Sequence, residues 1–305
     1  MAKDVFREVL QHRIDAGDWS VGRWWDESRI PLGSIDRRLS DLIDLRGKKA
    51  LVTGGAGINL GQACVNRLAG SGADVAVVDL SAAAVKAAGR TYHREPPDAA
   101  AVADAAARKW GAKVIAVEGD VLEWDSLTQV YREVAERLGG IDIVVNNAID
   151  AAVGDFETLS VEDIDRTIRG TLRGTLYSSR IALDYLIPQR SGRIINVGSD
   201  AGGTHVPWLT LYGSLKAGVA QFTRFLGREV GHHGIQVMGV APGSMWGPGR
   251  PLPPEVPESL APLARTALER FQLPEEIANM VAFLASDASS AMNGVMIEMG
   301  GGLSV

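Results

Sequence analysis

Residues 49–79 read KALVTGGAGINLGQACVNRLAGSGADVAVVD. The segment begins with a short apolar run, Lys49–Thr53, and passes through the glycine-rich turn Gly54–Gly61 into a helical stretch that ends near Gly70. A second apolar strand then ends at Asp79. Glycines allow a tight turn and a close approach of the backbone to a pyrophosphate, whose charge the N-terminus of the helix attracts. A glycine-rich turn alone is a weak signal, but strand, turn, helix, strand and acid in this order predict a dinucleotide-binding unit.

Apolar strands alternate with helical stretches along the rest of the chain. The predicted strands are Lys49–Thr53, Asp74–Asp79, Lys113–Val117, Ile141–Asn146, Arg193–Val197, Gln236–Val240 and Val295–Glu298. This alternation predicts an α/β fold in one domain, a doubly wound parallel sheet of about seven strands with helices on both faces. Ligands of such sheets lie outside the carboxyl ends of the strands. The chain places Asp79, Asp120, Asn146, Ser199 and Pro242 at these ends.

A tyrosine and a lysine four residues apart, Tyr212 and Lys216, indicate the chemistry. A phenol has a pKa of about 10, and a nearby ammonium group lowers it toward neutrality. Side chains at i and i+4 lie on one face of a helix, so both can point into one site. The hydroxyl of Ser199, at a strand end, can hold a substrate oxygen beside the phenol. The three residues are suited to moving a proton on an alcohol/carbonyl pair, although the pair on its own also occurs on solvated helix faces.

These motifs together resemble the short-chain dehydrogenase/reductase family in its single-domain form, from about residue 47 to the C-terminus. Thr53–Gly61 is similar to the family's cofactor loop, Asn146-Asn147-Ala148 to its strand-end motif, and Asn293-Gly294 with Gly300–Gly302 to its last strand and tail. The resemblance implies that Ser199, Tyr212 and Lys216 are catalytic. It also implies that Asp120-Val121 lies beside the adenine and Pro242-Gly243 beside the nicotinamide.

From the resemblance and the glycine-rich motif we predict the residues that bind the cofactor. They are Gly54, Gly57, Asn59, Leu60, Gly61, Asp79, Leu80, Asp120, Val121, Asn147, Ala148, Tyr212, Lys216, Pro242, Gly243 and Met245. An acid at position 79 suits the ribose hydroxyls of NAD and repels the 2′-phosphate of NADP, so we expect NAD. Asp150, His205 and Trp246 are candidate substrate contacts, with loop packing as the alternative for His205. Asp150 and Asp200 could equally be solvated loop acids.

Three positions depart from the family pattern. The cofactor loop has an extra residue, and Asn59 stands where the middle glycine would fall; asparagine tolerates left-handed backbone better than most residues. Thr171 occupies the position of the usual catalytic asparagine, so it is either part of a proton relay or a helix-bending threonine. Gly247 takes the place of a threonine that touches the nicotinamide carboxamide, which leaves Ser244 as the nearest hydroxyl.

Composition excludes several classes of protein. The net charge of −6 without a basic tract argues against nucleic acid as a partner. No apolar stretch is long enough for a membrane span, and the N-terminus lacks the apolar run of a signal peptide. One cysteine, Cys64, excludes an internal disulfide framework and suits the cytoplasm; we expect it to be a buried packing residue. The few histidines give no metal signal.

Two segments exceed the common core, and a third segment is rich in proline. Residues 1–46 form an N-terminal extension whose Trp19, Trp24 and Trp25 are expected to cover a core or a subunit contact, with substrate gating as the alternative. Residues 86–110 are expected to form a surface insertion, ending in an alanine-rich helix. The proline-rich segment 244–273 is the predicted substrate lid, and its apolar residues favour a largely nonpolar substrate.

The sequence therefore predicts an NAD-dependent oxidoreductase that interconverts a secondary alcohol and a ketone. One alternative is a biosynthetic NADPH ketoreductase with the same site, against which Asp79 argues. The other is an NAD-binding regulatory or structural subunit that has lost turnover, which Thr171 and the altered loop favour but the Ser199-Tyr212-Lys216 set does not. The resemblance further implies a homotetramer or a dimer, formed through the helices that follow the fourth and fifth strands.

Overall fold

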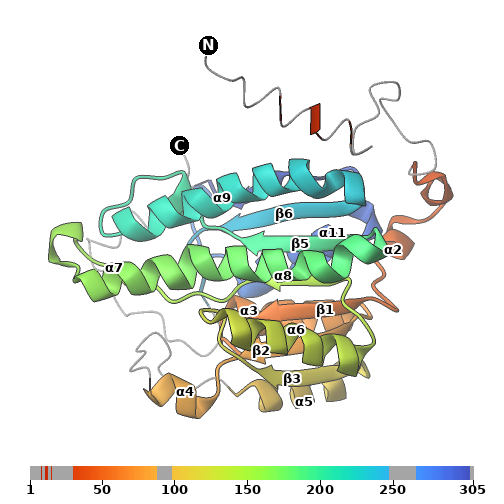
Figure 1. Cartoon of the computed structure of the whole chain (residues 1–305), viewed down its shortest axis with the longest axis horizontal. Coiled ribbons are helices and arrows are strands. Elements are labelled where there is room, and N and C mark those ends of the chain that lie inside the picture. The colour runs from red at the N-terminus through yellow and green to blue at the C-terminus, as the bar shows by residue number, and fades with distance from the viewer. Residues whose placement is uncertain are drawn as a thin grey trace. The chain divides into compact units, whose positions relative to one another are not determined.

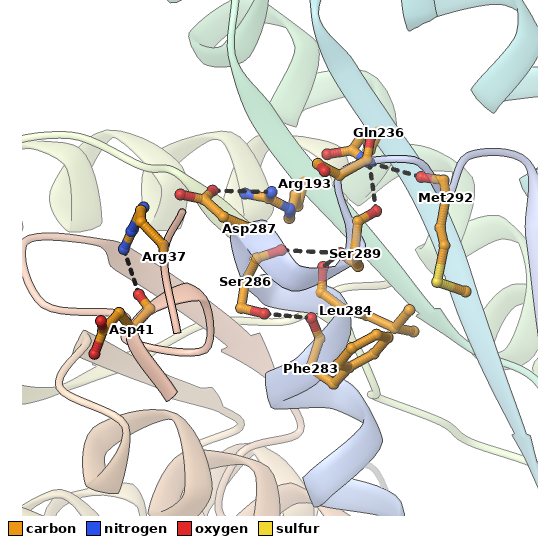
Figure 2. Close-up of polar contacts among 11 residues, drawn as sticks. Arg37, Asp41, Arg193, Gln236, Phe283, Leu284, Ser286, Asp287, Ser289 and Met292 are labelled. Atoms are coloured by element: carbon orange, nitrogen blue, oxygen red, sulfur yellow. Dashed lines mark hydrogen bonds and ion pairs between the residues drawn. The ribbon is translucent and has the colours of Figure 1, made fainter. Parts of the chain in front are cut away.

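The computed structural model describes Glu8, Gln11, His12, Asp15 and residues 30–87, 98–246 and 266–302. The chain divides into two compact units, Met1–Leu42 and Ile43–Val305. The described part of the first unit contains a 3₁₀ turn at Leu32–Ser34 and a short helix, α2 (Leu39–Leu42). The Arg37 guanidinium, just before α2, donates a hydrogen bond to the Asp41 carbonyl (Figure 2). The three tryptophans predicted to cover a core or a subunit contact lie outside the described residues.

The second unit is built on one seven-stranded parallel sheet with the order β3-β2-β1-β4-β5-β6-β7 (Figure 1). Its strands are β1 (Lys49–Thr53), β2 (Asp74–Asp79), β3 (Val114–Glu118), β4 (Ile143–Asn146), β5 (Gly192–Val197), β6 (Ile235–Pro242) and β7 (Val295–Met299). The predicted doubly wound fold is confirmed. Each predicted strand is present, and the bounds differ by at most two residues.

Strand register brings the ends of the central strands to one level. Thr53 pairs with Val78 on one side and with Asn146 on the other, and Asn146 pairs with Asn196. The order reverses between β1 and β4, since the chain runs outward to β3 and then returns to the middle of the sheet. This is the topological switch point at which ligands of open parallel sheets bind.

Helices cover both faces of the sheet (Figure 1). The α-helices among the described residues of this unit are α3 (Leu60–Gly70), α4 (Ala82–Ala87), α5 (Ala99–Trp110), α6 (Trp124–Leu138), α7 (Val161–Thr167), α8 (Gly174–Gln189), α9 (Thr210–Val230) and α11 (Pro274–Ala285). One apolar cluster joins a face of the sheet to α3, α5 and α11, and another joins the opposite face to α6, α8 and α9. Successive strand residues alternate between these clusters, as Leu51 and Val52 do, and each buried aliphatic side chain contributes about 1.5–3 kcal/mol.

The alanine-rich helix α5 is part of the core layer, whereas the sequence suggested a surface elaboration. Asp98 caps it by accepting a hydrogen bond of 2.8 Å from the Ala101 N–H. Ala99, Ala103 and Ala106 are buried in the same cluster as α3. Small side chains on one face let α5 pack closely on the sheet. The helix lies in the crossover connection from β2 to β3.

At the amino ends of the strands, opposite the carboxyl ends where ligands bind, polar contacts around the end of α11 stabilise the sheet (Figure 2). The Gln236 amide donates to the carbonyls of Ser289 (3.0 Å) and Met292 (2.7 Å), which ties the start of β6 to the segment before β7. The buried Arg193 guanidinium lies 3.3 Å from the Asp287 carboxylate, and burial lowers its pKa. These contacts fix the amino ends of β5 and β6.

Candidate active site

Lys216 lies one helical turn after the predicted catalytic Tyr212 on α9. Its side chain is 4% exposed, and its Nζ donates a hydrogen bond of 2.6 Å to the carbonyl of Val197, the last residue of β5. The same nitrogen lies 5.7 Å from the centre of the Tyr212 ring. The predicted i, i+4 arrangement on one helix face is therefore observed. Burial lowers the pKa of the Lys216 ammonium from 10.5 to about 8, so the group is poised near neutrality.

Ser199 follows β5 and begins a 3₁₀ turn, Asp200–Gly202. Its Oγ accepts a hydrogen bond of 3.2 Å from the Ala201 N–H, which orients the hydroxyl. Gly213 allows α9 to approach this turn, because a Cβ at that position would lie 2.5 Å from the Ala201 carbonyl oxygen. The glycine between the tyrosine and the lysine thus brings their helix against the serine, a role that sequence reasoning did not assign.

The cofactor loop depends on two glycines. Gly54 has a φ of +62°, and a Cβ there would lie 2.8 Å from Cα of Ala148. A Cβ on Gly61 would lie 2.0 Å from the Gly54 carbonyl oxygen, so this first turn of α3 must be bare. Asn59, the residue before α3, has a φ of −93° and is outside the left-handed region. Gly54 makes the tight turn, so the loop does not use the tolerance of asparagine for left-handed backbone at position 59.

Asp79 ends β2 and is 7% exposed. Its Oδ2 accepts a hydrogen bond of 2.9 Å from the Ala56 N–H, and its Oδ1 accepts one of 2.9 Å from the Leu80 N–H. The carboxylate therefore supports the glycine-rich loop from below while standing at the strand end. A bare turn, a helix N-terminus and an acid at the next strand end fit the pyrophosphate and ribose of a dinucleotide.

The remaining predicted cofactor residues lie at neighbouring strand ends. The N–H groups of Asn147 and Ala148 both donate to Thr53 Oγ1 at 3.1 Å, which joins β4 to β1. Asp120 Oδ1 accepts a hydrogen bond of 2.9 Å from the Leu122 N–H and so shapes the turn that contains Val121. The Gly243 N–H donates 3.2 Å bonds to the Met299 carbonyl and the Gln272 Oε1, just after Pro242.

Sequence reasoning missed a buried amide network behind the site. The Asn146 Nδ2 donates to Asn196 Oδ1 at 2.8 Å and to Ser179 Oγ at 3.0 Å. The Asn196 Nδ2 in turn donates to Thr223 Oγ1 at 2.9 Å. This network links β4, β5, α8 and α9, and the signal in the sequence was an asparagine at or next to the end of each of two strands.

Thr171 lies in a π-helical segment, Ile168–Arg173, between α7 and α8. It is 1% exposed, and its hydroxyl oxygen is buried with no hydrogen-bond partner in the described part of the chain. The back-bonding geometry of a helix-bending threonine is not observed; the Thr171 carbonyl instead accepts a 3.3 Å bond from Thr175 Oγ1. Single π-helical turns inside α-helices are frequent at functional sites, and this one packs against α9.

The candidate substrate residues differ in exposure. Asp150 is 5% exposed, and its Oδ1 lies 3.9 Å from Nε of Arg166, so it is not a solvated loop acid. A Cβ on Gly170 would lie 2.4 Å from the Asp150 carbonyl, which fixes the π-helical segment against this loop. His205 is exposed, and Trp246 is partly buried.

Only the two ends of the predicted lid are described, 244–246 and 266–273, and Gly247 lies outside them. Gln272, which sequence reasoning missed, joins these ends. Its N–H donates to the Ser244 carbonyl (3.1 Å), its carbonyl accepts from the Trp246 N–H (2.9 Å), and the Met245 backbone forms a bridge with it. The side chain of Gln272 is buried against Gly243, as described above.

Other observations concern chemistry outside this site. The described residues contain no group of three histidine, cysteine or acidic side chains that could hold a metal ion. Within the same residues no helix has the length and apolarity to cross a membrane. Cys64 is buried in α3 as predicted, and burial raises the pKa of its thiol to about 12.

Comparison with known proteins identifies close similarities across this unit. A family model described as short chain dehydrogenase matches residues 48–248. The 3-oxoacyl-(acyl-carrier-protein) reductase of Aquifex aeolicus is 32% identical over 262 residues, with 86% of this chain and 99% of that protein covered. The cyclohexanol dehydrogenase of a Rhodococcus species is 33% identical over 278 residues, with 87% and 99% covered.

A solved structure shows the same similarity. It is a short chain dehydrogenase from Burkholderia cenocepacia in complex with NADP, 30% identical to this chain, with a TM-score of 0.72. The superposition covers 86% of this chain and 99% of that one.

Proposed function

Because the chain belongs to the short-chain dehydrogenase/reductase family, and is thus an NAD(P)-dependent oxidoreductase acting on alcohols or ketones, we propose that it interconverts a secondary alcohol and a ketone with NAD. In the oxidative direction, the Tyr212 phenolate takes the proton of the substrate hydroxyl. A bound nicotinamide cofactor would supply the acceptor for the hydride that leaves the carbon bearing this hydroxyl. The products are the ketone, the reduced cofactor and a protonated Tyr212, which must pass its proton to solvent before the next turnover.

The burial of Lys216 beside Tyr212 is the observation that carries this proposal. A positive charge close to a phenol favours the phenolate, and low polarity strengthens the effect. The hydrogen bond to Val197 holds Nζ in place, so the charge does not depend on a mobile side chain. Ser199 orients the substrate oxygen and stabilises charge on it. General acid–base catalysis of this kind contributes about 10²–10⁴-fold.

Asp79 supports NAD as the cofactor. A carboxylate at the end of β2 accepts hydrogen bonds from ribose hydroxyls and repels a 2′-phosphate. The alternative, an NADPH-dependent ketoreductase, is favoured by the similarity to a 3-oxoacyl reductase and to a structure in complex with NADP. The similarity to a cyclohexanol dehydrogenase favours a largely nonpolar secondary alcohol. We place a regulatory subunit without turnover last, because Ser199, Tyr212 and Lys216 are all present.

We also propose self-association through α8 and α9, as a dimer or a homotetramer. Phe225, on α9, is 66% exposed and offers an apolar ring to a second copy of the chain. Light scattering during gel filtration measures the oligomeric state, and Phe225→Asp should shift the equilibrium toward the monomer.

The activity is tested by incubating purified protein with NAD or NADP and a panel of cyclic, aromatic and steroidal alcohols, while cofactor reduction is followed by absorbance. Turnover with a secondary alcohol and a higher kcat/KM with NAD are expected. Preference for NADP would favour the ketoreductase. Cofactor binding without turnover on any alcohol or matching ketone would favour the regulatory subunit.

A further inference from the structure

Asp200, the residue after Ser199, carries a carboxylate that has no hydrogen bond or ion pair to a lysine or an arginine among the described residues. Its Oδ1 lies 3.4 Å from Ser199 Oγ, a long contact. Its Oδ2 is buried and has no hydrogen-bond partner among the described residues. The ends of β6 and β7 face this oxygen with glycines: a Cβ on Gly243 would lie 2.7 Å from Oδ2, and one on Gly300 would lie 3.1 Å from it.

The charged and titratable groups around Asp200 come from three directions. On α9, the Nζ of Lys216 donates a hydrogen bond to the Val197 carbonyl, and Tyr212 lies one helical turn before Lys216. On β7, Glu298 is a like charge that disfavours ionisation of Asp200. His205 follows in the same loop and is exposed. Within the described part of the chain, no hydrogen bond or ion pair joins Asp200 to a lysine or an arginine.

A buried carboxylate without a counter-charge is costly. Burial accordingly raises the pKa of Asp200, with Glu298 adding to the effect and the Ala201 N–H and the Ser199 hydroxyl opposing it. Such groups cluster at functional sites. The cost is reduced if a ligand brings a positive charge to this place.

The proposed reaction brings a positive charge to this place. The nicotinamide carbon that exchanges hydride must approach the reacting carbon of the substrate to about 3–3.5 Å. In the proposed reaction, Ser199 and Tyr212 hold the oxygen attached to that substrate carbon. The nicotinamide ring of a bound cofactor would therefore lie close to Ser199, and so close to Asp200. This ring is positively charged when oxidised and neutral when reduced.

We propose that the Asp200 carboxylate is the counter-charge of the oxidised nicotinamide ring, so that the protein binds the oxidised cofactor in preference to the reduced one. The inference rests on the proposed function, because it requires a bound nicotinamide dinucleotide. Asp200 acts through space and needs no direct contact. A unit charge several ångströms away in a partly buried site changes affinity by about tenfold.

The experiment measures the dissociation constants of NAD⁺ and NADH separately, by calorimetry and by NADH fluorescence, for the full chain and for Asp200→Asn. The substitution removes the charge and keeps the shape. We expect binding of NAD⁺ to weaken by about tenfold and binding of NADH to stay unchanged. Asp104→Asn, an exposed carboxylate on α5, is the matched control and should leave both constants unchanged. If NADP proves to be the cofactor, its oxidised and reduced forms replace this pair.

The ratio of the two constants protects the test from a folding defect, since loss of folded protein affects both cofactor forms alike. In the wild-type protein, the affinity for NAD⁺ should also fall as the pH drops through the pKa of Asp200, and more steeply than that for NADH. An unchanged ratio in Asp200→Asn overturns the proposal, including when turnover falls, because Asp200 would then act only on Ser199. Absence of binding of either cofactor form to the wild-type protein contradicts the proposed function itself.

Discussion

The Lys216 ammonium donates a hydrogen bond of 2.6 Å to the carbonyl of Val197, two residues before Ser199. This bond fixes the lysine of α9 to the end of β5, and the serine leaves the same strand end. The position of the charge relative to the substrate oxygen is therefore set by the sheet. The arrangement has a cost, because an ammonium group is held in a site where burial disfavours its charge.

Replacing Lys216 with methionine should remove that cost together with the activity. The lowering of the lysine pKa from 10.5 to about 8 corresponds to about 3 kcal/mol at neutral pH, from which the loss of a donor to the Val197 carbonyl subtracts about 1–3 kcal/mol. Lys216→Met should therefore raise the free energy of unfolding at pH 7 by about 1 kcal/mol, while turnover falls sharply. Chemical denaturation and steady-state kinetics measure the two effects.

The gain in stability should depend on pH in a defined direction. Between pH values of about 8 and 10.5 the unfolded wild-type chain binds a proton that the folded chain has lost, so wild-type stability rises with pH there. The methionine variant lacks this rise, and its advantage should shrink across the same range. Lys109→Met, on the exposed surface of α5, is the control and should show no such trend. A variant less stable than wild type at pH 7 would mean that the hydrogen bond outweighs desolvation.

Much of this site was predictable because its residues follow from local rules. Glycine spacing, an acid after an apolar run and an i, i+4 pair are short-range patterns, and parallel strands bring their carboxyl ends together. Gly54, Asp79 and Lys216 were identified as candidate site residues in this way. The sequence does not indicate which residue of a glycine-rich turn takes the positive φ, and in the structure it is Gly54 and not Asn59.

The rest depends on contacts between segments far apart in the chain. Gln272 acts on Gly243 from 29 residues away, and nothing near it in the sequence marks it as buried. The alanine-rich helix α5 was predicted to be a surface element, since the burial of Ala99, Ala103 and Ala106 depends on α3 and the sheet. The orphaned hydroxyl of Thr171 and the buried Oδ2 of Asp200 are visible only when every neighbouring element is in place.

Asp79→Asn should relax the choice of cofactor. The asparagine keeps one acceptor oxygen for the Ala56 N–H or the Leu80 N–H but loses the charge that repels a phosphate. The ratio of kcat/KM for NADP to that for NAD should rise by about tenfold or more. Asp79→Ala should also loosen the loop and lower the melting temperature. If neither variant changes the ratio, Asp79 serves the loop alone.

Tyr212→Phe should separate binding from chemistry. The ring that lies over Lys216 remains, so the fold and the affinity for cofactor should be preserved. Turnover should fall by about 10²–10⁴-fold, because only the acidic hydroxyl is lost. Cofactor affinity measured by fluorescence serves as the control. Residual activity within a few-fold of wild type would show that another group transfers the proton.

Thr171 offers a test of how the proton reaches solvent. Its hydroxyl is buried and has no hydrogen-bond partner within the described residues, and such a group costs about 1–3 kcal/mol. Thr171→Val keeps the shape and removes the hydroxyl, so it should be at least as stable as the wild-type protein. If the hydroxyl serves a relay from Lys216, this variant should turn over more slowly and shift the pH–rate profile, most where proton release limits the rate.

Thr171→Asn is the complementary variant, since it supplies a polar group at the same place in the π-helical segment. It should retain or exceed wild-type turnover if the position serves a relay. Melting temperatures and pH–rate profiles of both variants distinguish the two roles. A Thr171→Val protein that melts earlier with an unchanged profile would show that the hydroxyl only supports the segment. The proton released by Tyr212 would then leave through another group.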